Sequence, residues 1–263
     1  MRFNLFGRKL PPPPEPPPPE SPPEPSPLDV FVKPDSLAIN QARQDHLATL
    51  SLDLSNKTVL EVGAGIGLHT QFFLDRGCTI TVTDGDPANV AAIRERHPER
   101  DVRLLNLDLA ADLNEFGRFD IIYCYGTLYH LQHPEEALAR LASVCDGQIL
   151  VETIVAPGAY AELHLVTEPP SSDQAVGGIG CRPTRLWVLQ ELKRHFGHAY
   201  TTVTQPDHQD FELDWKLTKG SGNMRAVFIG SRDPLDLPTL RSDLPDRHCA
   251  LAKPAPPSGQ NTD

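Results

Sequence analysis

The sequence predicts an α/β fold with a doubly wound sheet of seven strands, mostly parallel, in which the final strand runs antiparallel. From residue 58 onward, short apolar segments alternate with helical patterns, which is typical of parallel strands joined by crossover helices. The first apolar segment leads directly into a glycine-rich turn. The last two, 199–204 and 225–231, follow each other without a helix between them, so we expect them to pair antiparallel.

The glycine-rich turn ends the first predicted strand, residues 58–62. It contains Gly63, Gly65 and Gly67, which let the backbone turn sharply and approach a ligand closely. A helical pattern follows at once, and the free N–H groups at the start of a helix point at such a ligand. A dinucleotide-binding turn would need a glycine at position 68, where this chain has Leu68. The pattern is therefore GxGxG, which differs from the dinucleotide fingerprint.

The turn resembles the first motif of the class I methyltransferases that use S-adenosylmethionine, in which an acidic residue stands two positions before the glycines. The resemblance implies a Rossmann-like fold and S-adenosyl-L-methionine as the cofactor. Because that cofactor carries an amino group and a sulfonium cation, an acid beside the glycines has an electrostatic role. The contacts carried over from the motif are Glu61, Gly63, Ala64, Gly65 and Gly67. The alternative is an α/β turn without a ligand.

A helix is predicted before the first strand, over residues 35–50, and its apolar residues are spaced to face a core. In the resembling family a helix at this place often covers the cofactor or substrate pocket. Asn40, Arg43 and His46 are therefore site candidates. A solvated helix face explains the same residues.

The second predicted strand, residues 78–83, ends at Asp84. In a doubly wound sheet an acid at this place lies beside the glycine turn, where its two oxygens can accept the hydroxyl groups of a ribose. We therefore predict that Asp84 and Gly85 contact the cofactor. Helices are predicted on either side of this strand, over 68–76 and 88–97.

The third predicted strand, residues 101–106, leads to Leu107 and Asp108. The resemblance implies that both residues contact the adenine of the cofactor. Alternatively, Asp108 caps a helix that the pattern predicts over 109–116.

The fourth predicted strand, residues 119–124, feeds a loop that adjoins the glycine turn across the topological switch point. In this loop we assign Tyr125 to the cofactor site, and Tyr129 and His130 to catalysis. The sequence Leu-Tyr-His resembles many small-molecule O- and N-methyltransferases, and also the family that transfers a carboxymethyl group to the wobble uridine of transfer RNA. His130 is the candidate general base, because a neutral imidazole can take the proton of a hydroxyl nucleophile. The alternative is that His130 only packs or hydrogen-bonds under the cofactor.

A helix and a fifth strand, residues 148–153, follow in the pattern. Residues 156–181 then show no clear periodicity, and a connection of this length is either a functional lid or disorder. We favour a substrate lid, because the connection leaves the carboxyl edge of the sheet. Arg182 and Arg185 come next and are candidates for binding an anionic substrate, although a solvated helix start explains them equally well.

Composition divides the chain into three parts. Twelve of its 27 prolines lie before residue 28, so residues 1–28 are predicted to be a disordered arm that serves as a linker or meets a protein partner. Residues 29–233 are the predicted methyltransferase domain, and residues 234–263 a disordered tail. The formal net charge of −11 disfavours a broad surface for nucleic acid. Five cysteines without a CxxC pair indicate neither disulfides nor zinc, and favour the cytoplasm.

These observations together predict an enzyme that moves a methyl group from S-adenosylmethionine to an oxygen or nitrogen of its acceptor. A small-molecule acceptor is favoured, and neither a metal nor a membrane span is indicated. One alternative is a non-catalytic module that binds S-adenosylmethionine, and another is carboxymethyl transfer to transfer RNA. A nicotinamide-dependent oxidoreductase is disfavoured by Leu68 and by the paired final strands.

Overall fold

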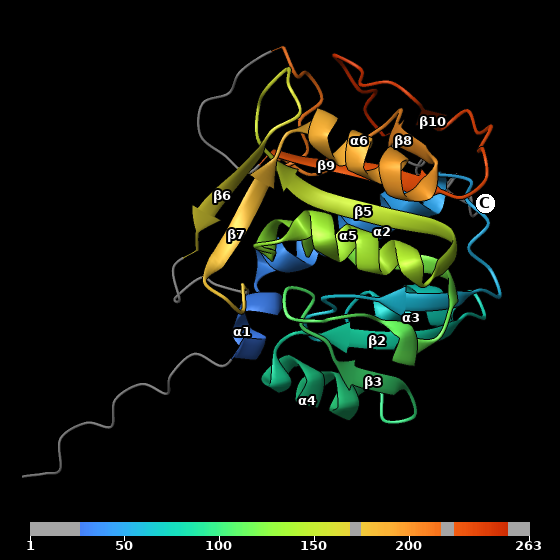
Figure 1. The fold of residues 1–263 in the computed structure, drawn as a ribbon. Coiled ribbons are helices and arrows are strands. Elements are labelled where there is room, and N and C mark those ends of the chain that lie inside the picture. The colour runs from blue at the N-terminus through green and yellow to red at the C-terminus, as the bar shows by residue number, and fades with distance from the viewer. Residues whose placement is uncertain (1–26, 169–174, 217–223, 252–263) are drawn as a thin grey trace, which may run out of the picture.

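The computed structural model describes residues 27–168, 175–216 and 224–251. Its main sheet has eight strands in the order β10-β8-β9-β5-β4-β1-β2-β3 (Figure 1). Five neighbouring strands are parallel: β1 (Thr58–Glu61), β2 (Thr79–Asp84), β3 (Asp101–Leu104), β4 (Phe119–Tyr125) and β5 (Cys145–Val155). The strand order reverses between β1 and β4, and a doubly wound sheet binds its ligands at the carboxyl ends of such strands.

The other edge of the sheet is antiparallel. β9 (Met224–Ser231) lies between β5 and β8 (His198–Thr202) and runs antiparallel to both. This confirms the predicted antiparallel end of a mostly parallel sheet. The strand count is eight rather than seven, because β10 (Leu240–Arg241) adds an antiparallel strand beside β8.

The predicted disordered tail is wrong as far as residue 251. Leu240 and His248 are buried, and the backbone N–H of Cys249 donates to the carbonyl of Val203 at 2.9 Å. Residues 252–263 of the predicted tail lie outside the described residues. At the other end, α1 (Pro27–Phe31) is helical where the predicted arm was expected to end, and residues 1–26 lie outside the described residues.

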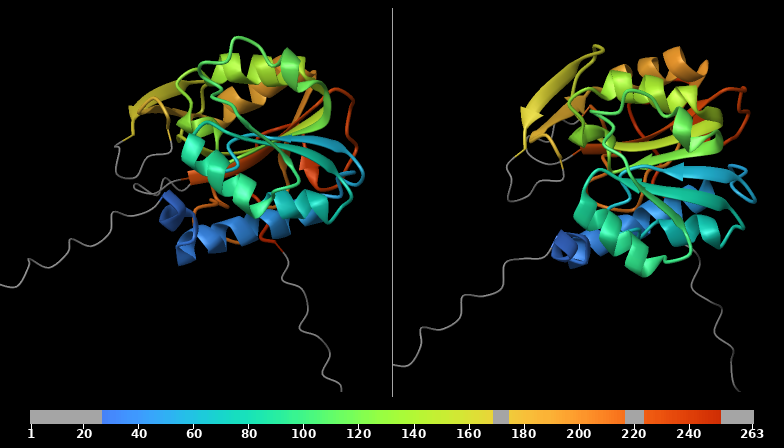
Figure 2. Two further views of the ribbon diagram at one scale, coloured as in Figure 1. Left: turned by 90° about the horizontal axis from the view of Figure 1, so that it is seen from below. Right: turned by 60° about the horizontal axis from the view of Figure 1, so that its bottom comes forward.

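Helices cover both faces of the sheet. On one face lie α2 (Pro34–Thr49), α3 (Thr70–Leu74) and α4 (Pro87–Arg96), and on the other lie α5 (Pro134–Ser143) and α6 (Arg185–Phe196) (Figure 2). Successive residues of β4 serve the two cores in turn: Ile121 and Tyr123 belong to one, Ile122 and Cys124 to the other. β4 and β5 contain long apolar runs because both faces of the sheet are covered. No helix in the described part of the chain is long and apolar enough to cross a membrane.

The predicted helix over 109–116 is not formed. That stretch contains only a short 3-10 turn, η1 (Asn114–Phe116). The side chains of Asn106 and Asp112 each accept a hydrogen bond from the backbone N–H two residues further on, at 3.0 and 2.9 Å. Such local bonds compete with helix formation, so the chain turns instead.

The connection that we expected to be irregular contains two strands. β6 (Leu163–Thr167) and β7 (Ile179–Pro183) pair antiparallel in a separate two-stranded sheet that projects beside the main one (Figure 1). β7 lies against η2 (Leu128–His130), the short turn that carries the predicted catalytic residues. The arrangement places this small sheet at the carboxyl edge, where a substrate lid was predicted.

Candidate functional site

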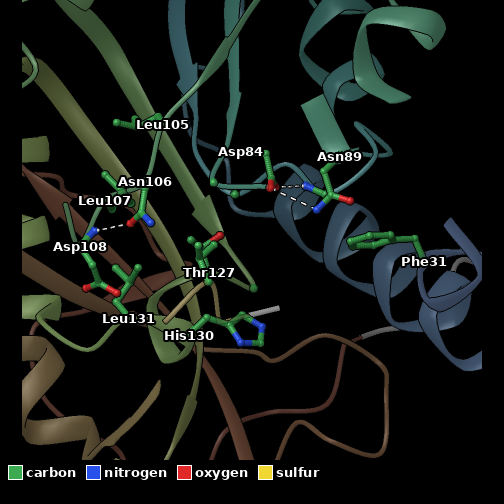
Figure 3. A pocket seen from close by; sticks show the side chains of 15 residues that line it. Phe31, Asp84, Asn89, Leu105, Asn106, Leu107, Asp108, Thr127, His130 and Leu131 are labelled. Carbon is green, nitrogen blue, oxygen red and sulfur yellow. Dashed lines mark hydrogen bonds between the residues drawn. The ribbon is translucent and has the colours of Figure 1, made fainter. Parts of the chain in front are cut away.

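Two adjoining cavities open at the carboxyl ends of the central strands, and they share Phe31, Gly63, Gly65 and Gly126. The first, drawn in Figure 3, is also lined by Asp84, Gly85, Asn89, Leu105, Asn106, Leu107, Asp108, Thr127, His130, Leu131 and Val176. The second is also lined by Val30, Ser36, Ile39, Asn40, Arg43, Glu61, Val62, Ala64, Leu68, His69, Tyr123, Tyr125, Tyr129 and Arg225. Every residue predicted for the site lines one of the two, except Gly67, Arg182, Arg185 and His46. His46 is fully buried, and its Nε2 lies 3.1 Å from the carbonyl of Thr204.

The glycine turn forms the boundary between the cavities. Gly63 and Gly65 have φ angles of 63° and 59°, a conformation that favours glycine. A Cβ atom on Gly63 would lie 2.3 Å from Oγ1 of Thr127, and one on Gly65 would lie 2.4 Å from Cε1 of Phe31. Gly67 also has a positive φ, 74°, but it packs away from the cavities, and its carbonyl lies 3.1 Å from Nε2 of His97.

Asp84 ends β2 on the wall of the first cavity. Its Oδ2 accepts a hydrogen bond from the N–H of Gly65 at 2.7 Å, and its Oδ1 accepts from Nδ2 of Asn89 at 3.1 Å (Figure 3). Burial raises the pKa of this carboxyl group, and the hydrogen bonds that it accepts from the neighbouring N–H groups oppose that rise. The acid is thus held rigidly beside the glycine turn, at the place where the sequence predicts a ribose contact.

Leu107 and Asp108 lie on the opposite wall of the first cavity. The carboxylate of Asp108 accepts hydrogen bonds from the backbone N–H groups of Gln132 and His133, at 2.9 to 3.1 Å. It therefore binds the two residues that precede α5, and it does not cap a helix over 109–116. Asn106, which the sequence analysis did not single out, brings an amide to the same wall.

Glu61 and Tyr125 line the second cavity. Glu61 is 2 % exposed, and its Oε2 accepts a hydrogen bond from Oγ1 of Thr70 at 2.6 Å. Burial raises the pKa of Glu61 to about 7. The hydroxyl of Tyr125 is buried and has no hydrogen-bond partner among the described residues. A polar ligand in this cavity would supply the missing partner.

Two arginines from distant elements meet in the second cavity. Arg43 of α2 lies 2.5 Å and Arg225 of β9 lies 3.1 Å from the carboxylate of Glu152, which is fully buried at the end of β5. Arg225 also donates to the hydroxyl of Tyr129 at 3.2 Å, and lies 3.7 Å from Asp210. Both guanidinium groups line the cavity, whereas the two carboxylates lie behind them. The sequence analysis proposed Arg43 but missed Arg225.

His130 lies at the edge of the first cavity, next to Thr127 (Figure 3). Its Nδ1 is 2.7 Å from Oε2 of Glu168, and Nε2 is buried without a hydrogen-bond partner among the described residues. The other oxygen of Glu168 accepts from Nη1 of Arg182 at 3.1 Å. Burial alone would raise the pKa of Glu168, but His130 and Arg182 outweigh it and lower the pKa to about 2. Glu168 is therefore an ionised acceptor.

The two arginines predicted to bind an anionic substrate have other contacts. Arg182 supports Glu168 and donates to the carbonyl of Tyr129 at 3.3 Å. Arg185 donates to the carbonyl of Pro245 at 2.9 Å and lies over the ring of Trp215, on the side of the C-terminal segment. Neither arginine lines either of the two cavities. The described residues contain no group of three His, Cys, Asp or Glu side chains arranged to hold a metal ion.

Residues 60–146 match a family described as "Methyltransferase domain". Two curated relatives are tRNA U34 carboxymethyltransferases. The protein of Photobacterium profundum is 32% identical over 136 residues, which cover 45% of this chain and 42% of the relative. The protein of Vibrio campbellii is 33% identical over 206 residues, which cover 68% and 62%. The chain therefore spans less than two thirds of the length of either relative.

Two solved structures share the fold. The N-terminal domain of EvdMO1 with SAH bound has a TM-score of 0.54 at 20% identity, over 74% of this chain and 80% of that one. An S-adenosylmethionine-dependent methyltransferase from Mesorhizobium loti has a TM-score of 0.52 at 15% identity, over 73% and 98%. The glycine turn, the sheet topology and the matched region agree: residues 60–146 of this chain form a methyltransferase domain, and the fold is that of the class I S-adenosylmethionine-dependent methyltransferases.

Proposed function

We propose that the protein transfers a methyl group from S-adenosylmethionine to an oxygen or nitrogen atom of a small acceptor. The observation that carries this proposal is the junction of the two cavities at Gly63 and Gly65, with buried Asp84 on one side and buried Glu61 on the other. S-adenosylmethionine has two parts, a nucleoside and an amino-acid arm, and each part can occupy one of the two cavities. The sulfonium supplies an activated methyl group when the cofactor is bound.

The residues on the two walls suit the two halves of that molecule. In the first cavity, Asp84 is placed to accept from a ribose, and Asn106 with Leu107 to face the adenine. In the second, Glu61 offers a carboxylate to an ammonium group, and the pKa near 7 that it has without a ligand would fall beside that cation. The chain's own contribution is to hold the reactants in line, exclude water and remove a proton.

Calorimetric titration with S-adenosylmethionine, S-adenosylhomocysteine and NAD tests the cofactor. The substitution Asp84→Asn places an N–H₂ group next to either the N–H of Gly65 or Nδ2 of Asn89, and two donors cannot form a hydrogen bond. The ribose also loses its charged acceptor. We expect affinity for both sulfur nucleosides to fall about 10- to 100-fold, since a hydrogen bond to a charged group contributes about 1.5 to 3 kcal/mol.

The matched control is Asp101→Asn. Asp101 is exposed at the amino end of β3, so it lies at the opposite edge of the sheet and its change should leave affinity unaltered. Binding of NAD alone, or of none of the three compounds, would overturn the proposal.

A second candidate is carboxymethyl transfer to transfer RNA, which the names of the curated relatives suggest. A carboxymethyl donor carries a carboxylate on the carbon that is transferred. Arg43 and Arg225 offer two guanidinium groups to such a carboxylate on the wall of the second cavity. The formal net charge of −11 favours a small-molecule acceptor instead, because a negatively charged protein repels the phosphates of RNA.

Mass spectrometry of the products separates the two candidates. The protein is incubated with unmodified transfer RNA and either S-adenosylmethionine or its analogue with a carboxylated methyl group, and the nucleosides are analysed. A carboxymethylated uridine that Arg225→Ala abolishes would favour the second candidate. Methylation of small hydroxyl or amine acceptors, with no change in the RNA, would favour the first.

We also infer that the protein acts in the cytoplasm. All five cysteines are free thiols, and four of them are buried. A reducing compartment is where such thiols persist. Fractionation of cells that express the full chain would test this inference, and recovery from the medium or the periplasm would contradict it.

A further inference from the structure

We propose that Glu168 is a positioning residue for His130, holding the imidazole in the tautomer whose Nε2 takes a proton from the acceptor. This inference rests on the proposed function and narrows it. It concerns the class of acceptor and a residue that no pattern in the sequence singles out. Glu168 stands 38 positions from His130 in the chain, at the end of β6.

The geometry of the pair fixes which nitrogen carries the proton. Glu168 lies 2.7 Å from Nδ1 of His130, and an ionised carboxylate can only accept. Nδ1 of the neutral ring must therefore be the N–H, which leaves the lone pair on Nε2. That nitrogen is buried and has no partner among the described residues, although its ring lines the first cavity. An unpartnered buried acceptor beside a cavity is the arrangement that a general base needs.

The carboxylate is itself held in place. Nη1 of Arg182 donates to its second oxygen at 3.1 Å, and Arg182 is tied back to the carbonyls of Tyr129 and Cys181 at 3.3 and 2.8 Å. These bonds join β7 to η2, the turn that carries His130. Arg182 thus has a role in the site, but it acts through Glu168 and not as the substrate contact that the sequence predicted.

Two arginines lie near the pair. Arg182 on β7 lies 3.1 Å from the carboxylate of Glu168, and Arg225 on β9 lies 4.9 Å from the centroid of the Tyr129 ring. That ring lies 4.1 Å from the ring of His130, centroid to centroid. Asp108 and Glu135 lie further off and affect Cys181, whose thiol donates to the carbonyl of Leu128. With Arg182 neutralising Glu168, a proton gained by His130 forms an ion pair with a carboxylate already in position.

The proton step can be written without a further reagent. The acceptor's O–H or N–H bond breaks, and its proton goes to Nε2 of His130. The electron pair left on the oxygen or nitrogen forms the new bond to the methyl carbon, and the pair of the old carbon–sulfur bond returns to sulfur, which becomes a neutral thioether. An acceptor atom that already carries a negative charge, or a nitrogen with a lone pair and no N–H to lose, needs no base. The site therefore suits a hydroxyl or an N–H acceptor that must lose a proton.

The histidine tautomer tests the inference without any acceptor. Ring nitrogen shifts of ¹⁵N-labelled histidine report which nitrogen carries the proton, and the His130 signals are assigned with His130→Gln. We expect the proton of wild-type His130 on Nδ1, and a mixture of tautomers in Glu168→Gln, because an amide can donate as well as accept. The matched control is Glu162→Gln, which alters an exposed glutamate 3.6 Å from His164 on the same strand pair.

Kinetics complete the test. With an acceptor in hand, we expect Glu168→Gln to lower kcat about 10- to 100-fold, which is part of the about 10²- to 10⁴-fold that general base catalysis contributes. The Kd for S-adenosylmethionine should change less than about twofold. Glu168→Asp should recover part of the loss, and the acid limb of the pH profile should move to lower pH in Glu168→Gln. A proton on Nε2 in the wild type, or an unchanged tautomer and kcat in Glu168→Gln, would overturn the inference. Absence of cofactor binding would overturn the proposed function instead.

Discussion

The substitution Gly63→Ala should destabilise the protein more than its backbone conformation alone explains. A φ of 63° is left-handed, which disfavours alanine by about 1 to 2 kcal/mol, and a more restricted unfolded chain returns about 0.4 to 1 kcal/mol of that. The new Cβ would also lie 2.3, 2.6 and 2.9 Å from Oγ1, Cγ2 and Cβ of Thr127. Rotation of the threonine cannot relieve the contact with its Cβ.

The overlap sets the size of the effect. Thr127 is buried, and its hydroxyl donates to the carbonyl of Val62 at 3.0 Å. Forcing an atom into such packing costs about 1 to 3 kcal/mol, and loss of the hydrogen bond about 1 more. We therefore expect Gly63→Ala to lower the free energy of unfolding by about 3 to 5 kcal/mol, a large part of the stability of an ordinary domain.

Urea unfolding followed by circular dichroism measures this effect, with Gly178→Ala as the matched control. Gly178 has a similar φ of 68°, but a Cβ there would have no neighbour within 4 Å, so only the backbone effect of about 1 kcal/mol remains. Adding Thr127→Ala to Gly63→Ala should leave the double variant about 1 to 2 kcal/mol more stable than the sum of the single effects predicts. If Gly63→Ala is no less stable than Gly178→Ala, the close approach of Thr127 to the turn is refuted.

Three further results are expected. Burial lowers the pKa of His46 and His248 to about 4, so the unfolded chain binds these protons first as the pH falls. The free energy of unfolding should be constant above about pH 6.5 and fall by on the order of 3 kcal/mol per histidine down to about pH 4, measured as Tm against pH. Thr184→Ala should lower the free energy of unfolding by about 1 to 2 kcal/mol, because the Thr184 hydroxyl caps α6 at the N–H of Trp187. Thr184→Ser keeps the hydroxyl and should have no such effect; urea unfolding midpoints of the two variants measure the difference. Glu152→Ala removes the carboxylate that pairs with two buried arginines, so the free energy of unfolding should fall by about 3 to 5 kcal/mol in the same assay. An unchanged midpoint would show that these ion pairs do not contribute to stability.

The central sheet and the glycine turn were predictable because their signals are local. A parallel strand covered on both faces is a continuous apolar run, and β4 and β5 show such runs. Asp84 could be placed in the site because it directly follows its strand, so its position needs no knowledge of distant segments. Arg225 and Glu152 carry a weaker local signal: each is a charged residue in an otherwise apolar strand. Their pairing across β5 and β9 becomes visible only with the register.

The rest of the site depends on contacts between segments that have no local pattern. β6 is largely exposed and lacks the alternation that reveals a strand, so Glu168 at its end carried no signal. β10 is two residues long, which is too short to show the alternation of apolar and polar residues that predicts a strand. The proline-rich segment around it suggested disorder. Phe31 reaches the glycine turn from α1, more than thirty positions away along the chain, and no motif precedes it.

The proposed cofactor contacts and the proposed general base are held by different sheets. Asp84 ends β2 of the main sheet, and Gly63 and Gly65 lie in the turn that follows β1. Both strands are paired on both sides. His130 is oriented by Glu168 and Arg182, which stand on the appended sheet of β6 and β7. A change in this small sheet can therefore alter the proposed proton acceptor, His130, while the proposed nucleotide contacts remain intact. Acceptor choice in this protein should accordingly follow the sequence of β6 and β7, and cofactor affinity should follow the turn after β1.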